Sequence, residues 1–135
     1  MPQINNYSYL NIYLAPTLRF LVELTTWSWF LLAALMKDTV YILFFFLSVF
    51  LLAVFNFPGD KMKDGPINVQ GWVRISIEAF SALLGVFGAW VLFGDIGLLL
   101  QLTLTIFVFI VDFERLRWML GLRKNPPIWV KNLGR

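Results

Sequence analysis

Four long apolar runs dominate the pattern of hydrophobic and polar positions along the chain. Each is close to the roughly 20 residues that an α-helix needs to cross the hydrocarbon core of a bilayer. Only Lys37-Asp38 separates the first run from the second, and only Gly94-Asp95 separates the third from the fourth. Because such short links join antiparallel neighbours, the pattern predicts an all-α polytopic membrane protein whose four transmembrane helices form two tandem hairpins. The predicted spans are about residues 16–36, 39–57, 73–93 and 96–113.

Polar segments flank and connect these spans. Residues 58–72, rich in proline, glycine, aspartate and lysine, are expected to form a loop between the hairpins. Residues 114–135 form a basic tail. The first 15 residues, with three tyrosines among asparagines, are expected to lie where lipid meets water. The whole chain, residues 1–135, is thus predicted to form a single transmembrane domain.

The composition excludes several classes of protein. Of the 135 residues, 59% are hydrophobic and 14% are charged, against roughly 45–50% and about 25% in a soluble domain. A chain of this length cannot bury so much apolar surface in its own core, which excludes a water-soluble monomer. The absence of cysteine and histidine removes disulfides, thiolate or imidazole metal sites and histidine catalysis. Since no catalytic motif is present either, we expect no enzyme, no metal and no cofactor.

The basic residues predict the orientation in the membrane. With four spans, both termini and the central loop share one side, which carries ten of the eleven lysines and arginines. The other side carries only Lys37. Because basic residues concentrate on the cytoplasmic side, both termini are expected to be cytoplasmic. This asymmetry also accounts for the net charge of +3, so no nucleic-acid partner is expected.

The two predicted hairpins resemble each other in sequence. Residues 19–23 (RFLVE) correspond to residues 74–78 (RISIE), at an offset of 55. Asp38 and Asp95 each open the second helix of a hairpin, where an aspartate can accept hydrogen bonds from free backbone amides. Both copies start on the same side, so the repeat predicts a pseudo-two-fold axis along the membrane normal.

Small residues recur at helical spacing on the third predicted helix, at Ser81, Gly85 and Ala89. Such a stripe lets two helix backbones approach closely. We expect it to pack the third helix against the first, and the alternative is a homodimer face.

Six polar side chains are predicted to meet at the cytoplasmic end of the bundle, at the starts of two helices and the ends of the other two. They are Arg19, Glu23, Asn56, Arg74, Glu78 and Asp112. The two arginines and three carboxylates leave one surplus carboxylate, which would tend to hold a proton in a site of low dielectric constant. A structural network between helices, a proton- or cation-linked site and a lipid-headgroup site are all consistent with this set.

The tail after the last span is predicted to touch anionic lipid headgroups, because it contains six basic residues and two tryptophans. The residues concerned are Arg115, Arg117, Trp118, Arg123 and Lys124. Docking to a cytoplasmic partner is the alternative.

Three segments resemble the YrdB family of small bacterial membrane proteins, a domain of unknown function. They are residues 18–24 (LRFLVEL), 55–61 (FNFPGDK) and 71–78 (GWVRISIE), and residues 114–118 (ERLRW) are similar to the end of that family's last span. The resemblance covers roughly residues 10–120. It implies a bacterial inner membrane and four spans, and it brings no established activity and no functional residues.

Two functions therefore compete. The first is a non-catalytic membrane protein that serves as an accessory or structural component through contacts with helices and lipid, with a second copy or a membrane-complex partner. The second is a small transporter or channel-like protein for a solute or ion, which would use the predicted charge cluster. For this second function, Phe30, Phe45 and Phe87 would close a cytoplasmic vestibule.

Overall fold

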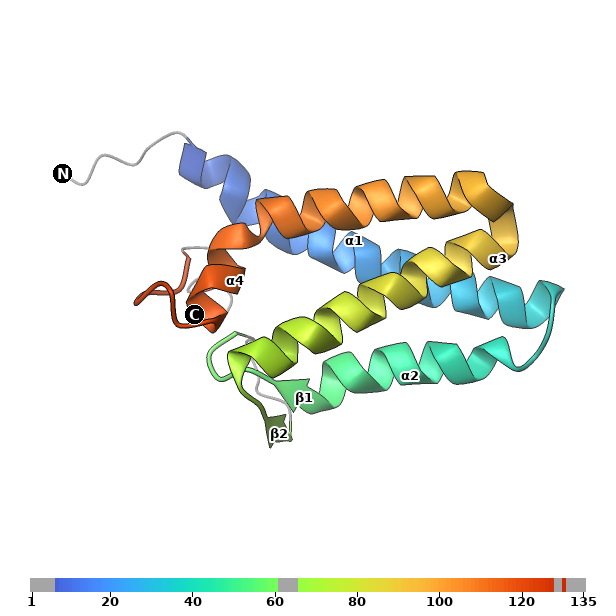
Figure 1. Cartoon of the computed structure of the whole chain (residues 1–135), viewed down its shortest axis with the longest axis horizontal. Coiled ribbons are helices and arrows are strands. Elements are labelled where there is room, and N and C mark those ends of the chain that lie inside the picture. The colour runs from blue at the N-terminus through green and yellow to red at the C-terminus, as the bar shows by residue number, and fades with distance from the viewer. Residues whose placement is uncertain (1–6, 61–65, 128–129, 131–135) are drawn as a thin grey trace.

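The computed structural model describes residues 7–60, 66–127 and 130, with side chains from residue 13 onward, and is mostly helical (Figure 1). Its helices are α1 (Tyr7–Met36), α2 (Tyr41–Val54), α3 (Gly71–Val111) and α4 (Phe113–Met119). Two short strands, β1 (Phe55–Asn56) and β2 (Ile67–Asn68), pair in parallel. Two helices, α1 and α3, are long and apolar enough to cross a membrane, and α2 is a shorter apolar helix.

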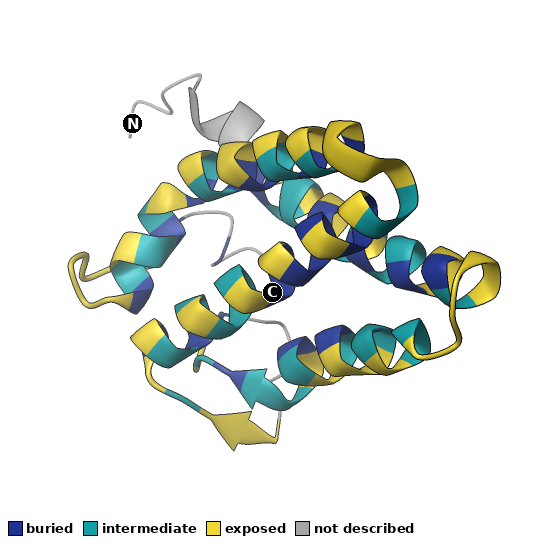
Figure 2. Ribbon diagram, turned by 45° about the vertical axis from the view of Figure 1, so that its right-hand side comes forward, coloured by how far each residue is buried: buried dark blue, intermediate teal, exposed yellow. Residues whose placement is uncertain are grey.

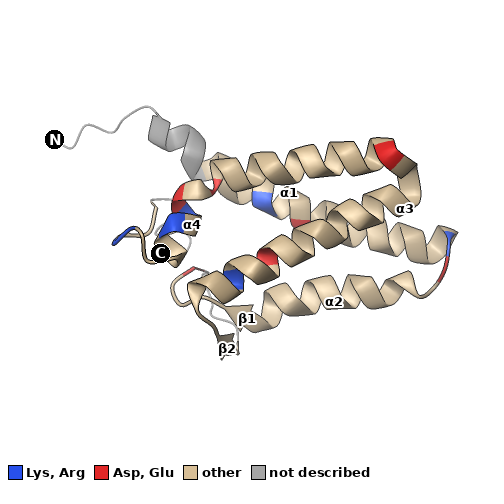
Figure 3. Cartoon of the chain, in the orientation of Figure 1, with Lys and Arg blue, Asp and Glu red and all other residues tan. Residues whose placement is uncertain are grey.

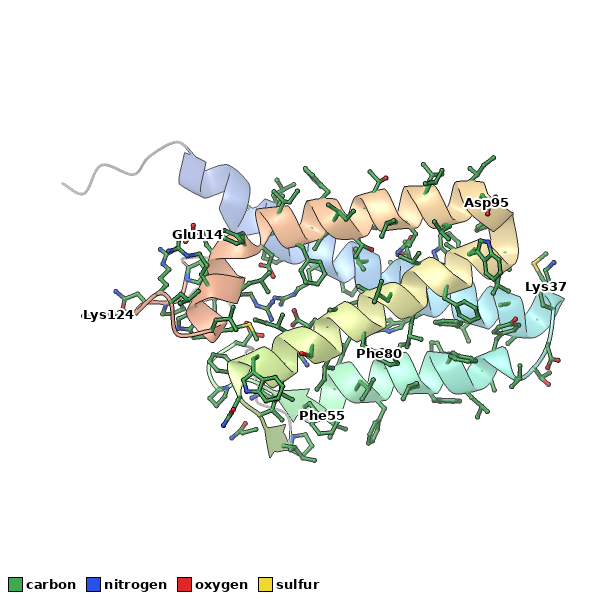
Figure 4. All side chains as sticks on the ribbon, viewed as in Figure 1. Lys37, Phe55, Phe80, Asp95, Glu114 and Lys124 are labelled. Atoms are coloured by element: carbon green, nitrogen blue, oxygen red, sulfur yellow. The ribbon has the colours of Figure 1, made fainter. Side chains whose placement is uncertain are left out.

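α3 contains a break that divides it into two arms, residues 71–93 and 95–111. Gly94 adopts φ 67° and ψ −150°, a conformation that only glycine reaches without strain. The chain turns back on itself there, with Asp95 at the bend (Figure 4). The break therefore falls within the Gly94-Asp95 link that was predicted to separate two helices.

The other helix boundaries differ from the prediction. α1 begins at Tyr7, so Pro16 lies inside the helix and not at its start. α2 ends at Val54, and the next two residues extend into β1 instead of continuing the helix. The backbone carbonyls of Leu52 and Phe55, which helix continuation would have occupied, accept hydrogen bonds from Arg74 Nη1 at 3.2 and 2.6 Å.

Buried residues follow the inner faces of the helices (Figure 2). Many large apolar side chains are exposed on the outside. α1 packs more extensively on α3 than on α2. Val22, Ala82 and Val108, from α1 and the two arms of α3, form a buried cluster. Phe30 and Ala33 continue this core toward the other end of α1.

The small-residue stripe lies inside this packing. A Cβ built on Gly85 would overlap the hydroxyl oxygen of Thr26 in α1, and one on Gly88 would lie 3.1 Å from Trp29 Cβ. Ala89 is buried, and its backbone carbonyl faces Gly97 across the turn of α3. Because the stripe is covered by the same chain, it is not available as a homodimer face.

Replacing Gly85 with Ala should destabilise the bundle by roughly 1–3 kcal/mol through overpacking against Thr26. Denaturant titration in detergent measures this loss. Leu83→Phe is the control, because Leu83 is exposed on the same helix and has room to grow.

If the loss comes from this contact, Thr26→Ala should restore part of the stability of Gly85→Ala, so that the double variant is less damaged than the sum of the single variants. Additive losses would contradict the assignment of the clash to Thr26.

Candidate functional site

Arg115 in α4 lies at the centre of the charged groups that the fold brings together. Its Nε donates to Asp60 Oδ1 at 2.5 Å and its Nη2 donates to Asp60 Oδ2, a bidentate pair. The same guanidinium donates to both carboxylate oxygens of Glu78, at 3.0 and 2.6 Å, and to Asp112 Oδ2 at 2.8 Å. One fully buried arginine therefore joins a loop, both arms of α3 and α4.

Arg74 extends this set toward α2. Its Nε donates to Glu78 Oε1 at 3.2 Å, and its Nη1 donates to the backbone carbonyls of Leu52 and Phe55 at the end of α2. Glu78 is thus shared by two arginines, one on its own helix and one on α4.

Arg19 extends the set to α1. Its Nη1 lies 3.8 Å from Asp112 Oδ2, so an arginine of the first predicted hairpin contacts a carboxylate of the second. Six residues form this connected set, which we term the Arg115 network: Arg19, Asp60, Arg74, Glu78, Asp112 and Arg115. Glu23 is half-buried one helical turn after Arg19.

Burial alone would disfavour the charge of Arg115. The negative charge of Glu78 and the hydrogen bonds to Asp60 and Glu78 outweigh that effect, so the pKa of the Arg115 guanidinium lies above its ordinary value. Arg115 is therefore a permanent buried cation that must keep its carboxylate partners.

The structure corrects one part of the lipid-headgroup prediction. Arg115 is 0% exposed and cannot reach a headgroup, because its guanidinium is fully engaged by carboxylates. Arg117 and Arg123 are exposed and pair with Glu114 at 3.8 and 2.5 Å, and Lys124 is exposed. Trp118 is half-buried and packs edge-on against Phe57, with ring centroids 5.0 Å apart.

Asn56 is buried beside the network but has a different neighbour. Its Nδ2 donates to Asn68 Oδ1 at 3.1 Å, across the β1–β2 pair. This hydrogen bond connects β1, at the end of the first predicted hairpin, to β2, which lies just before α3. The structure therefore brings Arg19, Arg74, Glu78 and Asp112 into one connected set and gives Asn56 a role in the strand pair.

Sequence reasoning missed two members of the network, Asp60 and Arg115. Asp60 was assigned to a polar loop and Arg115 to a lipid anchor, yet they are each other's bidentate partners. Both lie in segments that carry the resemblance to the YrdB family, residues 55–61 and 114–118. The available signal was an aspartate in one motif and an oppositely charged arginine in the other.

A cavity lies next to the network, in the middle of the helical segments. It has a volume of about 40 Å³, which is enough for about three water molecules. Its wall includes Arg19, Glu23, Glu78 and Asp112 and continues inward to Ser81 and Thr105. We term it the central cavity.

Residues that line the central cavity carry polar atoms with no hydrogen-bond partner in the described part of the chain. These atoms are Trp27 Nε1, Ser81 Oγ, Thr105 Oγ1 and Asp112 Oδ1. Buried polar groups normally have a hydrogen-bond partner, from protein or water, and an unmet one costs about 1–3 kcal/mol. Four such atoms around one cavity indicate that it holds polar content.

Farther from the charged end, the polar side chains are hydrogen-bonded to one another. After this polar layer, a cluster of phenylalanine rings fills the space between the helices. Trp29 Nε1 donates to Gln101 Oε1 at 3.2 Å, and Gln101 Nε2 donates to Thr25 Oγ1 at 3.0 Å. Phe30, Phe44 and Phe87 then meet with ring centroids 5.5 to 6.5 Å apart. Phe44 takes the position that was expected for Phe45, whose ring contacts Phe46 instead.

No group of three or more acidic residues in the described part of the chain is arranged to hold a metal ion. The chain matches no protein-family model, and comparison with curated proteins and with solved structures also found no match.

Replacing Arg115 with Gln should destabilise the fold by roughly 3–5 kcal/mol, because it leaves buried carboxylates without their cation. Arg117→Gln is the matched control, since Arg117 is exposed on the same helix and its ion pair is worth at most about 1 kcal/mol. The measurement is the free energy of unfolding in detergent.

The direct partnership is tested by a double-mutant cycle with Asp60→Asn. The double variant should be less destabilised than the sum of the two single variants. Strict additivity would mean that Asp60 and Arg115 act independently.

Proposed function

We propose that this chain is a multi-pass integral protein of the bacterial inner membrane, with both termini in the cytoplasm. In this proposal α1, α2 and the two arms of α3 are the four membrane-crossing segments, arranged as two hairpins related by a pseudo-two-fold axis along the membrane normal. Its role is that of a non-catalytic accessory or structural component, which works through helix and lipid contacts.

The observation that carries the proposal is the apolar outer surface of the bundle. Large hydrophobic side chains are exposed on α1, on α2 and on both arms of α3, among them Leu35, Leu43, Leu83 and Leu100. A soluble monomer rarely exposes a contiguous apolar surface of this kind, whereas lipid tails would cover it. α2 alone is only about 21 Å long, and the bilayer can adapt to such a short element by local thinning.

The distribution of charge supports the same proposal. Among the described residues, the charged ones lie toward the two ends of the bundle, and the stretch between them carries none (Figure 3). Lys37 and Asp95 lie at one end, and Glu114 and Lys124 lie at the other (Figure 4). The second end also carries the Arg115 network, which fits the predicted cytoplasmic side.

The accessory role rests on how the charged groups are used. In the described part of the chain, the buried arginines hold carboxylates and helix-end carbonyls of this chain, which is the work of a structural network. The resemblance to the YrdB family, which stands on the sequence motifs alone, points to the same membrane.

A second candidate function is transport of a small solute or ion, and the central cavity favours it. The cavity carries polar atoms from the charged end into the bundle. The Phe30, Phe44 and Phe87 cluster lies across the remaining path, so transport would require these rings to move apart.

Cysteine labelling tests the topology, and the absence of native cysteine keeps it unambiguous. In intact spheroplasts, an impermeant thiol reagent should label Lys37→Cys and should leave Lys124→Cys unlabelled until the membrane is opened. Both positions are exposed, so each must react in detergent. The reverse pattern would contradict the orientation.

Flux measurements separate the two functions. Liposomes that contain the purified chain and an enclosed sodium or pH indicator should leak no faster than empty liposomes if the role is structural. A flux that depends on the chain and is lost in Phe87→Trp, which enlarges one ring of the aromatic cluster, would favour transport instead.

A further inference from the structure

Another hollow lies on the outside of the bundle, between the two arms of α3. It has a volume of about 500 Å³, within the range of roughly 300–1,000 Å³ that is typical of ligand pockets. Ala79 and Leu83 line it from the first arm, and Leu102 and Ile106 line it from the second. Among the described residues that line it, only Thr105 is polar. We term this hollow the α3 groove.

The α3 groove begins at the charged end of the bundle and ends part-way along the second arm. Phe113 and Leu116 line it at the charged end, and Leu102 is the lining residue of that arm farthest from this end. The stretch of helix from Leu102 to Phe113 is about 16 Å long. Half of the hydrocarbon core of a bilayer is about 15 Å thick. The groove therefore has the length of an acyl chain in one leaflet, the leaflet that meets the charged end.

A cation lies at the charged end of the α3 groove. The guanidinium carbon of Arg117 lies 5.9 Å from the centre of the Phe113 ring. The attraction between a guanidinium and an aromatic ring favours this position. Because Phe113 lines the groove, Arg117 is placed where the headgroup of a lipid in the groove would lie. The side chain of Arg117 is 44% exposed, so a headgroup can reach it.

The charges around Arg117 favour an anion. In the described segment from Phe113 to Lys124, three exposed basic residues, Arg117, Arg123 and Lys124, accompany one acidic residue, Glu114. Glu114 lies 2.5 Å from Arg123 and 3.8 Å from Arg117, so it is the closer partner of Arg123. The surface beside the groove therefore has an excess of positive charge, which attracts anionic headgroups.

An acyl chain fits the α3 groove better than another helix does. Helix interfaces in membranes are rich in small residues, which let two backbones approach closely. Ala79 is the one small apolar residue among the described residues that line the groove. Leu83, Ile106 and Phe113 are large and exposed there. A flexible chain can fill the uneven space between such side chains.

We propose that the α3 groove holds one acyl chain of an anionic phospholipid, whose phosphate accepts hydrogen bonds from the Arg117 guanidinium. A guanidinium can donate two parallel hydrogen bonds to a phosphate. Lipid tails are apolar everywhere in the bilayer, so the groove alone gives no preference among phospholipids, and the headgroup contact supplies the selectivity. This inference rests on the proposed membrane function and names the lipid that the chain would contact.

Photo-cross-linking of the full chain in liposomes tests the proposal. The liposomes consist of phosphatidylcholine with a small share of either phosphatidylglycerol or phosphatidylcholine that carries a photoactivatable acyl chain. Mass spectrometry of peptides then locates the labelled residues. Phosphatidylglycerol should label Leu83, Leu102 and Ile106, and phosphatidylcholine should label them about tenfold less, which is the effect of one hydrogen bond to a charged group.

Two variants assign the headgroup contact. Arg117→Gln should remove the tenfold preference for phosphatidylglycerol and leave labelling by phosphatidylcholine unchanged. Lys124→Gln is the matched control, because it removes the same charge from an exposed position of the same tail. This control should keep the preference.

Two further variants assign the acyl chain. Leu83→Trp fills part of the groove and should reduce labelling of Leu102 and Ile106 by both lipids. Leu43→Trp, at an exposed position of α2, is the matched control and should leave that labelling unchanged. Arg117 and Leu83 are both exposed, so neither replacement disturbs the buried core.

Three results would overturn the proposal. They are equal labelling of the groove by the two lipids, a preference that persists in Arg117→Gln, and a disulfide between two Ile106→Cys chains, which would place a second copy in the groove. Flotation of the same liposomes separates these results from a failure of the proposed function. A chain that floats with the liposomes without preferring either lipid contradicts the groove site alone, whereas a chain that does not float contradicts the membrane function.

Discussion

The arrangement of the charged end of this fold depends on one buried guanidinium, that of Arg115, which requires carboxylate partners. Arg115 is removed from water, and an unpaired cation there would cost several kcal/mol. Its three carboxylate partners come from the segment after β1, from the first arm of α3 and from the residue between α3 and α4. The ion pairs of Arg115 therefore fix the positions of the loop, the helix ends and the start of the basic tail relative to one another.

Arg74 connects that arrangement to the first helix pair by a different route. It donates hydrogen bonds to the backbone carbonyls of Leu52 and Phe55 at the end of α2, and it shares Glu78 with Arg115. The chain can then leave α2 early and pair β1 with β2, with Asn56 and Asn68 joined beside it. The early end of α2 thus coincides with contacts from a charged residue of α3, which local apolar patterning does not predict.

Local pattern predicted the features that depend on neighbours in sequence. The glycine at the turn of α3 has the positive φ that its position requires, and Gly85 has the close contact that its spacing suggested. Depth along the helices also predicted that Arg19, Glu78 and Asp112 would lie together. The partnership of Asp60 with Arg115 was not predictable in this way, because a loop and a tail 55 positions apart share no periodicity. The start of α1 at Tyr7 was missed because Pro16 was treated as a helix start, whereas the structure accommodates it inside the helix.

The two ends of the bundle differ in whether their buried polar atoms have hydrogen-bond partners, and the atoms without partners lie around the central cavity. Toward Phe30, the rings of Phe30, Phe44 and Phe87 contact one another. The polar side chains of Trp29, Gln101 and Thr25 are hydrogen-bonded to one another. Toward Arg115 the charged groups form close ion pairs. Among the described residues, Asp112 Oδ1 and the hydroxyls of Ser81 and Thr105 have no hydrogen-bond partner there. A purely structural network would gain from closing these last contacts, since each unmet buried group costs free energy. These atoms all belong to residues that line the central cavity, so the polar groups left outside the ion pairs are gathered in one place within the bundle.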